Sequence, residues 1–241
     1  GMDDKHPLDT EIIKHLGGRV QHLVTPTPRY SASGIGFCDR KLYFKVLGTP
    51  GVEHMPIDAE CRMAVGNTVH EVIQNRIKAR WPEAVIEGDM RPLEILPEQV
   101  EKRLGEEANF EGVIYCSGRP DILIPFHDED DPTNDMDIVV EIKTGGAGIL
   151  KMPISQSYRI QGGVYCRGLG VKWVFFLLCD RVGFGRKMVR LENPDDSWNE
   201  ALKIINLIEY HKNVLKAPPD VPRHLGKRIC SSCAYYKLCF T

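Results

Sequence analysis

A carboxylate and an amine lie two residues apart in VVEIKT, a short apolar stretch that covers residues 139–144. Alternate side chains of a β-strand point to the same face, so we expect Glu141 and Lys143 to project together. Val140 and Ile142 would face the other way. Burying such a charged pair costs free energy unless further groups hold it. The pair is therefore a candidate for chemistry.

A second carboxylate, Asp121, interrupts the apolar run GRPDILI at residues 118–124. If the two strands are neighbours, Asp121 and Glu141 meet across the ladder. Adjacent carboxylates repel each other unless a divalent cation lies between them, and oxygen ligands suit Mg²⁺ or Mn²⁺. A lysine beside such an ion would neutralise phosphoryl oxygens or orient an attacking water. The residues alone also allow an ordinary cross-strand salt bridge, with Asp121 in a turn.

Two helical stretches extend this pattern. GNTVHEVIQ, residues 66–74, places His70 on a helix, and IQGGVYC, residues 160–166, places Gln161 and Tyr165 four residues apart on one helix face. Taken singly, they indicate a core histidine and a packing pair. Taken in order, the chain contains G-x-x-x-H, G-x-x-D, E-x-K and Q-x-x-x-Y, beginning at Gly66.

This ordered set resembles the PD-(D/E)XK nuclease superfamily, in its RecB-like exonuclease branch. The resemblance implies a restriction-endonuclease-like fold. It implies that His70, Asp121, Glu141 and the backbone carbonyl of Ile142 hold Mg²⁺ or Mn²⁺. Lys143 would position or activate the water, while Gln161 and Tyr165 would contact the substrate or support the lysine. The residues themselves indicate a divalent-metal phosphodiester site, and only the resemblance implies an exonuclease.

Three of the eight cysteines gather near the C-terminus in CSSCAYYKLC, residues 230–239. A tetrahedral sulfur site takes four ligands. Four of the other cysteines, Cys61, Cys116, Cys166 and Cys179, fall in predicted helices or strands, where a free buried thiol is the usual state. The remaining one, Cys38, follows the loop SASGIGFC and precedes a basic run. It is the candidate for the fourth ligand.

The RecB-like branch includes iron–sulfur members, the AddB-type nuclease subunits and the CRISPR adaptation exonucleases, whose cysteine pattern is similar. The resemblance implies a [4Fe-4S] cluster that joins the two ends of the fold, with structural zinc as the alternative because four thiolates accept either metal. The ligands would be Cys38, Cys230, Cys233 and Cys239.

The period of the apolar residues predicts a mixed α/β fold with one central sheet flanked by helices. We expect helices over residues 9–17, 37–48, 58–81, 155–170 and 193–216, and strands over residues 111–118, 119–126, 137–144, 172–180 and 185–191. VTPTPRYSAS, residues 24–33, reads as a loop. One nuclease domain would cover residues 1–241, with an N-terminal segment over 25–57, a core over 58–215 and a cysteine-bearing tail over 216–241.

The charge distribution allows a polyanionic partner. The net charge of −2 hides a loop at 127–137 with six carboxylates and no Lys or Arg; outside it, bases outnumber acids. We expect that loop to be a solvated hairpin connection. Side chains that could stack on bases or pair with phosphates, although ordinary surface roles suit them equally, are Tyr30, Arg40, Lys41, Tyr158 and Arg159.

The sequence and the resemblance together predict a metal-dependent DNA exonuclease acting on single-stranded ends, in repair, recombination or CRISPR adaptation. The chain has no G-x-x-x-x-G-K-[ST] motif, so it would act alone or with a helicase or integrase-type partner. A catalytically silent DNA-end-binding module and an RNA-directed nuclease stay open. The polar N-terminus, the clustered cysteines and the lack of a long apolar run predict a cytoplasmic protein without membrane contact.

Overall fold

The structure, a computed structural model, describes residues 6–222 and 225–240. Its helices are α1 Pro7–Leu16, α2 Asp39–Val46, α3 Ile57–Arg80, α4 Pro97–Leu104, α5 Gln156–Leu169, α6 Pro194–Tyr210, α7 Lys227–Cys230 and α8 Tyr236–Phe240. Shorter helical turns are η1 Ala32–Gly34, η2 Pro132–Asn134, η3 Ala147–Leu150 and η4 His211–Leu215.

The strands are β1 Arg19–Val24, β2 Tyr30–Ser31, β3 Gly51–Pro56, β4 Val85–Ile86, β5 Leu93–Ile95, β6 Ile114–Ser117, β7 Ile122–Phe126, β8 Met136–Gly145, β9 Trp173–Asp180 and β10 Arg186–Arg190. The five-stranded sheet has the order β10-β9-β8-β7-β4. β8 runs antiparallel to β7 and parallel to β9, so this sheet is mixed.

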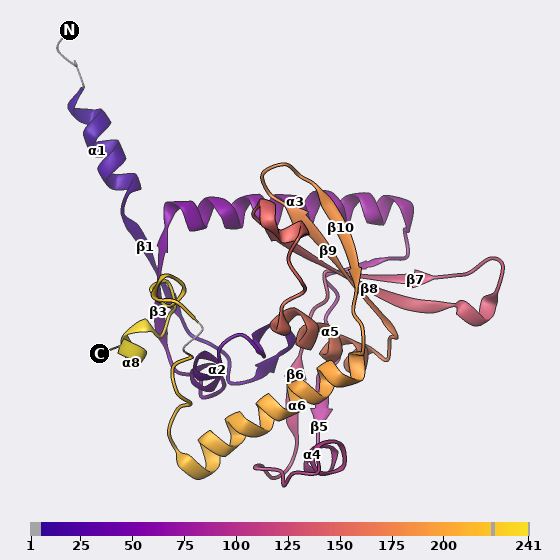
Figure 1. The fold of residues 1–241 in the computed structure, drawn as a ribbon. Helices are drawn as coiled ribbons and strands as arrows, with labels where there is room; N and C mark the ends of the chain where they lie inside the picture. The colour runs from indigo at the N-terminus through magenta and orange to yellow at the C-terminus, as the bar shows by residue number, and fades with distance from the viewer. Residues whose placement is uncertain (1–5, 223–224, 241) are drawn as a thin grey trace.

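Helices cover both faces of this sheet (Figure 1). On one face, Val139 packs in the larger core with residues of α5 and α6, such as Ile160 and Leu202. On the other face, Val140 and Ile142 form a smaller core, against which Val69, Ile73 and Ile77 of α3 pack. The alternation predicted for β8 is thus confirmed. Because β8 is covered on both faces, a charged side chain leaving it is buried.

The prediction of one central sheet is wrong in one respect. The described residues also form a two-stranded sheet of β1 and β3, and a three-stranded sheet in the order β2-β6-β5. The strand predicted over residues 111–118 belongs to the latter as β6, where it pairs in parallel with β2. The predicted loop before Ala32 thus contains a strand, Tyr30–Ser31. A strand of two or three residues is too short to show the alternation of apolar and polar residues by which a strand is recognised in sequence.

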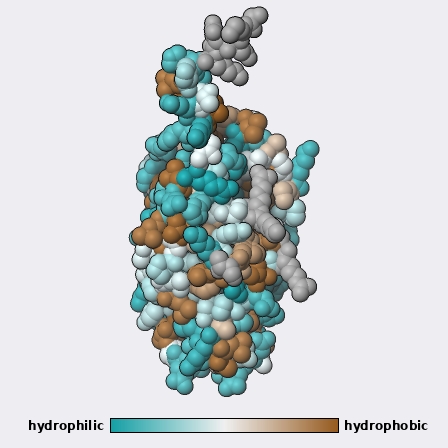
Figure 2. Space-filling view, turned by 90° about the vertical axis from the view of Figure 1, so that its left-hand side faces the viewer, coloured by the Kyte–Doolittle hydropathy of each residue, from teal (hydrophilic) through white to brown (hydrophobic). Residues whose placement is uncertain are grey.

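α1 projects from the body at the upper left of Figure 1, and none of its residues is buried. Figure 2 shows the face around this projection, where apolar residues are scattered among hydrophilic ones. α3 also carries exposed apolar residues, namely Met63, Val65 and Val72. Cys61 on α3 is exposed, so the expectation of a buried thiol is wrong there.

The connection between β7 and β8 is the expected exposed hairpin loop. Its acidic side chains accept hydrogen bonds from the loop itself: Asp128 from the backbone N–H groups of Asp130 and Asp131, and Asp135 from that of Asp128. No helix among the described residues combines the length and the apolar character needed to cross a membrane.

Candidate active site

Asp121 and Glu141 meet at the end of the β7–β8 ladder, as their spacing predicts. Asp121 directly precedes β7, and the next residue, Ile122, pairs with Val140. The Asp121 carboxylate accepts a hydrogen bond from the backbone N–H of Ile142 at 2.7 Å, and the Asp121 N–H donates to Glu141 Oε2 at 3.2 Å. These two bonds complete the strand pairing through side chains. They fix both carboxylates relative to the sheet.

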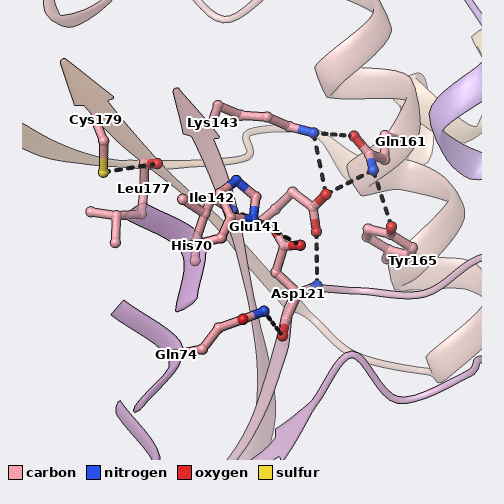
Figure 3. A network of polar contacts seen from close by, with 10 residues as sticks. All are labelled: His70, Gln74, Asp121, Glu141, Ile142, Lys143, Gln161, Tyr165, Leu177 and Cys179. Atoms are coloured by element: carbon pink, nitrogen blue, oxygen red, sulfur yellow. Dashed lines mark hydrogen bonds and ion pairs between the residues drawn. The ribbon is translucent and has the colours of Figure 1, made fainter. Parts of the chain in front are cut away.

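Lys143 and Gln161 hold the other oxygen of Glu141 (Figure 3). Lys143 Nζ lies 3.2 Å from Glu141 Oε1, which also accepts a hydrogen bond from Gln161 Nε2 at 2.8 Å. Lys143 donates a further hydrogen bond to Gln161 Oε1 at 2.7 Å, and Gln161 Nε2 contacts the Tyr165 hydroxyl at 3.0 Å. A buried carboxylate is therefore surrounded by donors, with the lysine held by two acceptors.

Burial dominates the electrostatics of Glu141, whose side chain is only 6% exposed. Desolvation raises the pKa of this carboxyl group; the Lys143 ammonium opposes the rise and the Asp121 carboxylate adds to it. Two carboxylates are thus kept close together, and one lysine pairs with Glu141. This is an arrangement that additional positive charge would stabilise.

His70 reaches the same place from α3. Its Nδ1 lies 3.5 Å from Asp121 Oδ1. The hydrogen bond with Asp121 raises the pKa of His70, although partial burial opposes the rise. One turn further along α3, Gln74 donates to the backbone carbonyl of Asp121 at 3.2 Å. Gly66, on the turn before His70, lies near β8: a Cβ there would stand 3.0 Å from Thr144 Oγ1.

The structure therefore brings six predicted residues into one network, here called the polar cluster: His70, Asp121, Glu141, Lys143, Gln161 and Tyr165. They come from α3, the residue before β7, β8 and α5, which are separate elements along the chain. Ile142 contributes its N–H to Asp121. Its backbone carbonyl as a metal ligand stays a prediction.

Two glycines let α5 approach closely enough to place Gln161. A Cβ at Gly162 would stand 2.8 Å from the Leu191 side chain, and one at Gly163 would stand 2.8 Å from the backbone nitrogen of Trp198. α5 is consequently packed tightly between the sheet and α6. Tyr165 is 2% exposed, and burial raises the pKa of its hydroxyl. Gly118 leaves room for it, since a Cβ there would lie 2.9 Å from Tyr165 Cε1.

A cavity of about 730 Å³ opens onto the polar cluster. Glu141, Lys143, Gln161 and Tyr165 line it, and so do two exposed arginines that the sequence analysis did not select, Arg29 and Arg119. Arg119 stands inside the G-x-x-D motif, so its position beside Asp121 was a usable signal. Arg29 precedes the missed strand β2, and no sequence feature marked it. Guanidinium groups at a cavity of this kind suit phosphate oxygens.

The polar cluster has the donor chemistry for Mg²⁺ or Mn²⁺, namely two carboxylates and one imidazole. The repulsion between the carboxylates and the raised pKa of Glu141 fit the same cation. At present these oxygens are occupied by hydrogen bonds. Within residues 6–222 and 225–240, no three His, Cys, Asp or Glu side chains stand at metal-binding separations from one another.

The five side chains considered for nucleic-acid contact have different surroundings. Tyr30 is a correction: it is 3% exposed and its hydroxyl donates to Glu209 at 2.9 Å, so it packs within the protein. Arg40 donates to the backbone carbonyl of Pro219 at 2.8 Å and holds the C-terminal region. Arg159 donates to the Ile154 carbonyl. Lys41 and Tyr158 are half-buried, and the Tyr158 ring covers Lys143 Nζ at 4.6 Å from its centroid.

The C-terminal tail returns to the segment around α2 and β3. The Ala234 carbonyl accepts a hydrogen bond from the Val52 N–H at 3.0 Å, and the Tyr235 hydroxyl donates to the Thr49 carbonyl at 3.0 Å. Tyr235 is 1% exposed and packs on Phe44, with ring centroids 5.2 Å apart. The tail is thus docked by the buried Tyr235 ring, by these two hydrogen bonds and by the hydrogen bonds that Arg40 donates to it.

This docking brings the four selected cysteines to one region, here called the cysteine contact. Cys38 caps the start of α2, where its sulfur accepts from the Lys41 N–H. Burial raises the pKa of the Cys38 thiol, and the nearby Cys233 and Cys239 thiols act in the same direction. Burial together with Cys233 and Cys239 likewise raises the pKa of Cys230. All four cysteines are half-buried. Among the described residues, no three of them stand at metal-binding separations from one another.

Comparison with known proteins finds similarity in structure only. A scan of protein-family profiles and a search of curated proteins both gave no match. The crystal structure of SSO0001 is similar with a TM-score of 0.59 and 17% sequence identity, over 97% of this chain and 93% of that one. The crystal structure of an alkaline exonuclease, LHK-Exo from Laribacter hongkongensis, gives a TM-score of 0.44 and 15% identity, over 78% of this chain and 92% of that one.

The similarity to SSO0001 extends over nearly the whole chain, but at this level of identity it shows a shared fold alone. The chemistry of the chain has to be inferred from the residues of its own site.

Proposed function

We propose that this protein is a divalent-metal-dependent nuclease that hydrolyses phosphodiester bonds in DNA, as an exonuclease at single-stranded ends. The observation that carries the proposal is the buried Asp121–Glu141 pair with Lys143 held between Glu141 and Gln161, at a cavity that two arginines line. A salt bridge with a purely structural role would need neither the histidine nor the open cavity with its two arginines.

The residues of the polar cluster divide the work. Asp121, Glu141 and His70 would hold Mg²⁺ or Mn²⁺, which when bound activates water and offsets charge on the phosphate. The Lys143 ammonium would stabilise negative charge on a phosphoryl oxygen or orient the attacking water. Gln161 would keep that ammonium in place, and Tyr165 would keep Gln161 in place through its hydroxyl.

Arg29 and Arg119 would bind the phosphates that flank the bond being cut. They lie on the surface of the same cavity and have the bidentate geometry that phosphate oxygens favour. The exonuclease mode and the preference for single strands rest on the resemblance of the four motifs to RecB-like nucleases.

The test is digestion of end-labelled single-stranded DNA with Mg²⁺ or Mn²⁺, comparing wild type, Lys143→Ala and the control Lys172→Ala. Lys172 is an exposed lysine beside the start of β9. We expect cutting by wild type and the control, loss in Lys143→Ala, and loss in chelator. Cutting that survives Lys143→Ala would refute the assignment. DNA binding without any cutting would favour the silent end-binding module, and a preference for RNA would favour an RNA-directed nuclease.

We also propose that Cys38, Cys230, Cys233 and Cys239 hold a [4Fe-4S] cluster, with zinc as the alternative. Their gathering in one half-buried region supports the proposal, because Cys233 and Cys239 both disfavour ionisation of Cys38 and Cys230, and a bound metal would offset that repulsion. Protein purified without oxygen should absorb broadly near the visible–ultraviolet boundary, and Cys38→Ala should not. A colourless wild type that contains zinc would select the alternative.

A further inference from the structure

A second cavity adjoins the one that carries the arginines. Its volume is about 510 Å³, and it is lined mainly by apolar side chains and glycines. Thr144, which lines it, directly follows Lys143, and Tyr158 lines it as well. Because the Tyr158 ring lies 4.6 Å from Lys143 Nζ, this residue separates the catalytic lysine from the apolar cavity. No residue lines both cavities, but Lys143 of the polar cavity contacts the Tyr158 ring of the apolar one.

Three side chains form the part of this apolar cavity that could grip a flat ligand. Phe37 is 44% exposed and Met152 is 65% exposed, although both are large and apolar. The Tyr158 ring is oriented by stacking on Phe176, with centroids 6.4 Å apart and planes 23° apart. Exposed apolar side chains in a concave site are a mark of ligand binding rather than of folding.

The backbone before α2 is built to hold Phe37 against α5. Gly36 has φ of +91°, a conformation that L side chains rarely adopt. A Cβ there would lie 3.3 Å from the Ser157 Cα and 2.6 Å from the Ile160 side chain. The loop thus touches the first turns of α5, which also carry Tyr158. This contact brings Phe37 and Tyr158 to the same cavity from distant parts of the sequence.

We propose that this apolar cavity is a nucleobase subsite, which takes one unpaired base of the strand whose phosphates lie along Arg29, Arg119 and Lys143. The inference rests on the proposed nuclease function and adds a residue-level account of strand preference. A nucleic-acid strand presents alternating charged and flat apolar groups, and adjoining polar and apolar cavities match that alternation. The faces of a paired base are covered by its neighbours in a duplex, so only an unstacked base can fill such a site.

The test removes the base and the cavity wall separately. A set of single-stranded oligonucleotides is prepared, each with one abasic residue at a different position near the end. Each is digested by wild type, Met152→Ala, Phe37→Ala and the control Phe126→Ala. Phe126 is 39% exposed but lies at the other end of β7 from Asp121. Met152→Ala tests the cavity more directly, because Phe37 is next to the proposed metal ligand Cys38 and its substitution could also disturb that site.

At one position, we expect the missing base to lower the wild-type kcat/KM by about fivefold or more, the range of one base–aromatic stack. Met152→Ala and Phe37→Ala should reduce this difference, and Phe126→Ala should keep it. The proposal is overturned if wild type cuts abasic and normal strands equally, or if Phe126→Ala reduces the difference as much as the cavity variants do.

Binding of 2-aminopurine oligonucleotides without added divalent metal separates this proposal from the nuclease proposal. Wild type should quench the 2-aminopurine fluorescence of single strands, Met152→Ala should quench it less, and neither should quench it in duplex DNA. This result would support the subsite even in a protein that cuts no DNA. Equal quenching by wild type and Met152→Ala, or by single strands and duplex, would overturn it while leaving nuclease activity untouched.

Discussion

The polar cluster and the cysteine contact both collect residues from distant parts of the sequence, but they are held in different ways. In the polar cluster, the β7–β8 pairing sets Asp121 opposite Glu141, and side-chain hydrogen bonds close the arrangement. In the cysteine contact, a tail docks through Tyr235 and a few backbone hydrogen bonds, one of which runs from the Cys233 N–H to the Cys230 carbonyl.

The difference lies in what supplies the stability. The polar cluster destabilises the fold, because burial disfavours the charged form of Glu141 and so raises its pKa. The two apolar cores on either side of the sheet hold the cluster in place. In the cysteine contact, the tail buries Ala234 and Tyr235 but leaves Leu238 and Phe240 exposed, so little apolar surface holds it. We infer that the first region keeps its geometry without a ligand, whereas the second depends on what the thiols bind.

Glu141→Gln should have the largest effect on activity. The substitution keeps the shape of the side chain but removes the charge that would face the metal, so we expect nuclease activity to fall by at least about a hundredfold. The exposed Glu192→Gln is the matched control. The measurement is the initial rate on labelled single-stranded DNA with Mn²⁺, with circular dichroism to verify folding. A folded variant with normal activity would exclude Glu141 from the chemistry.

Cys38→Ala should have the largest effect on stability. Losing one of four metal ligands would remove the bound cluster or zinc and, with it, about 3 kcal/mol, which corresponds to a fall in Tm of roughly 6–12 °C for a chain of this size. Thermal unfolding and metal analysis measure the two losses together. Cys61→Ala is the control, because Cys61 is exposed on α3. Equal metal content in both variants would contradict the role of Cys38.

Periodicity was sufficient to predict the parts of the fold on which the polar cluster depends. The alternation in VVEIKT places Glu141 and Lys143 on one face of β8, and the four-residue spacing places Gln161 beside Tyr165. These side chains lie on long, regular elements, where the residue number determines the direction of the side chain. That is why their convergence could be expected without coordinates.

Other features depend on long-range contacts that no local period encodes. The sequence offers Tyr30 as a side chain that could stack on bases, but its hydroxyl pairs with Glu209 on α6. Arg29 lines the cavity only because β2 pairs with β6, far along the chain. Short strands and loop arginines take their positions from tertiary structure, so sequence patterns could not place them.

Gly163→Ala should reduce stability through the scaffold of the polar cluster. The added Cβ would stand 2.8 Å from the Trp198 backbone nitrogen, so α5 and α6 must separate, at a cost of about 1–3 kcal/mol. Urea unfolding measures the loss, and Gly146→Ala is the control because nothing lies within 4 Å of its Cβ position. The shift of α5 should also weaken the hold of Gln161 on Lys143 and lower the rate. Unchanged stability would mean that the two helices have room to spare.

Tyr235→Phe should have the smallest effect and test the docking of the tail alone. The variant keeps the ring that packs on Phe44 but loses the hydrogen bond to the Thr49 carbonyl, which is worth about 1 kcal/mol. Limited proteolysis should cut the tail faster, and more so once the metal has been removed, because the cluster would otherwise hold the same segment. Tyr236→Phe, on a more exposed ring, is the control. If the metal-free and metal-bound forms respond equally, the cysteine contact is held by packing, and the contrast with the polar cluster disappears.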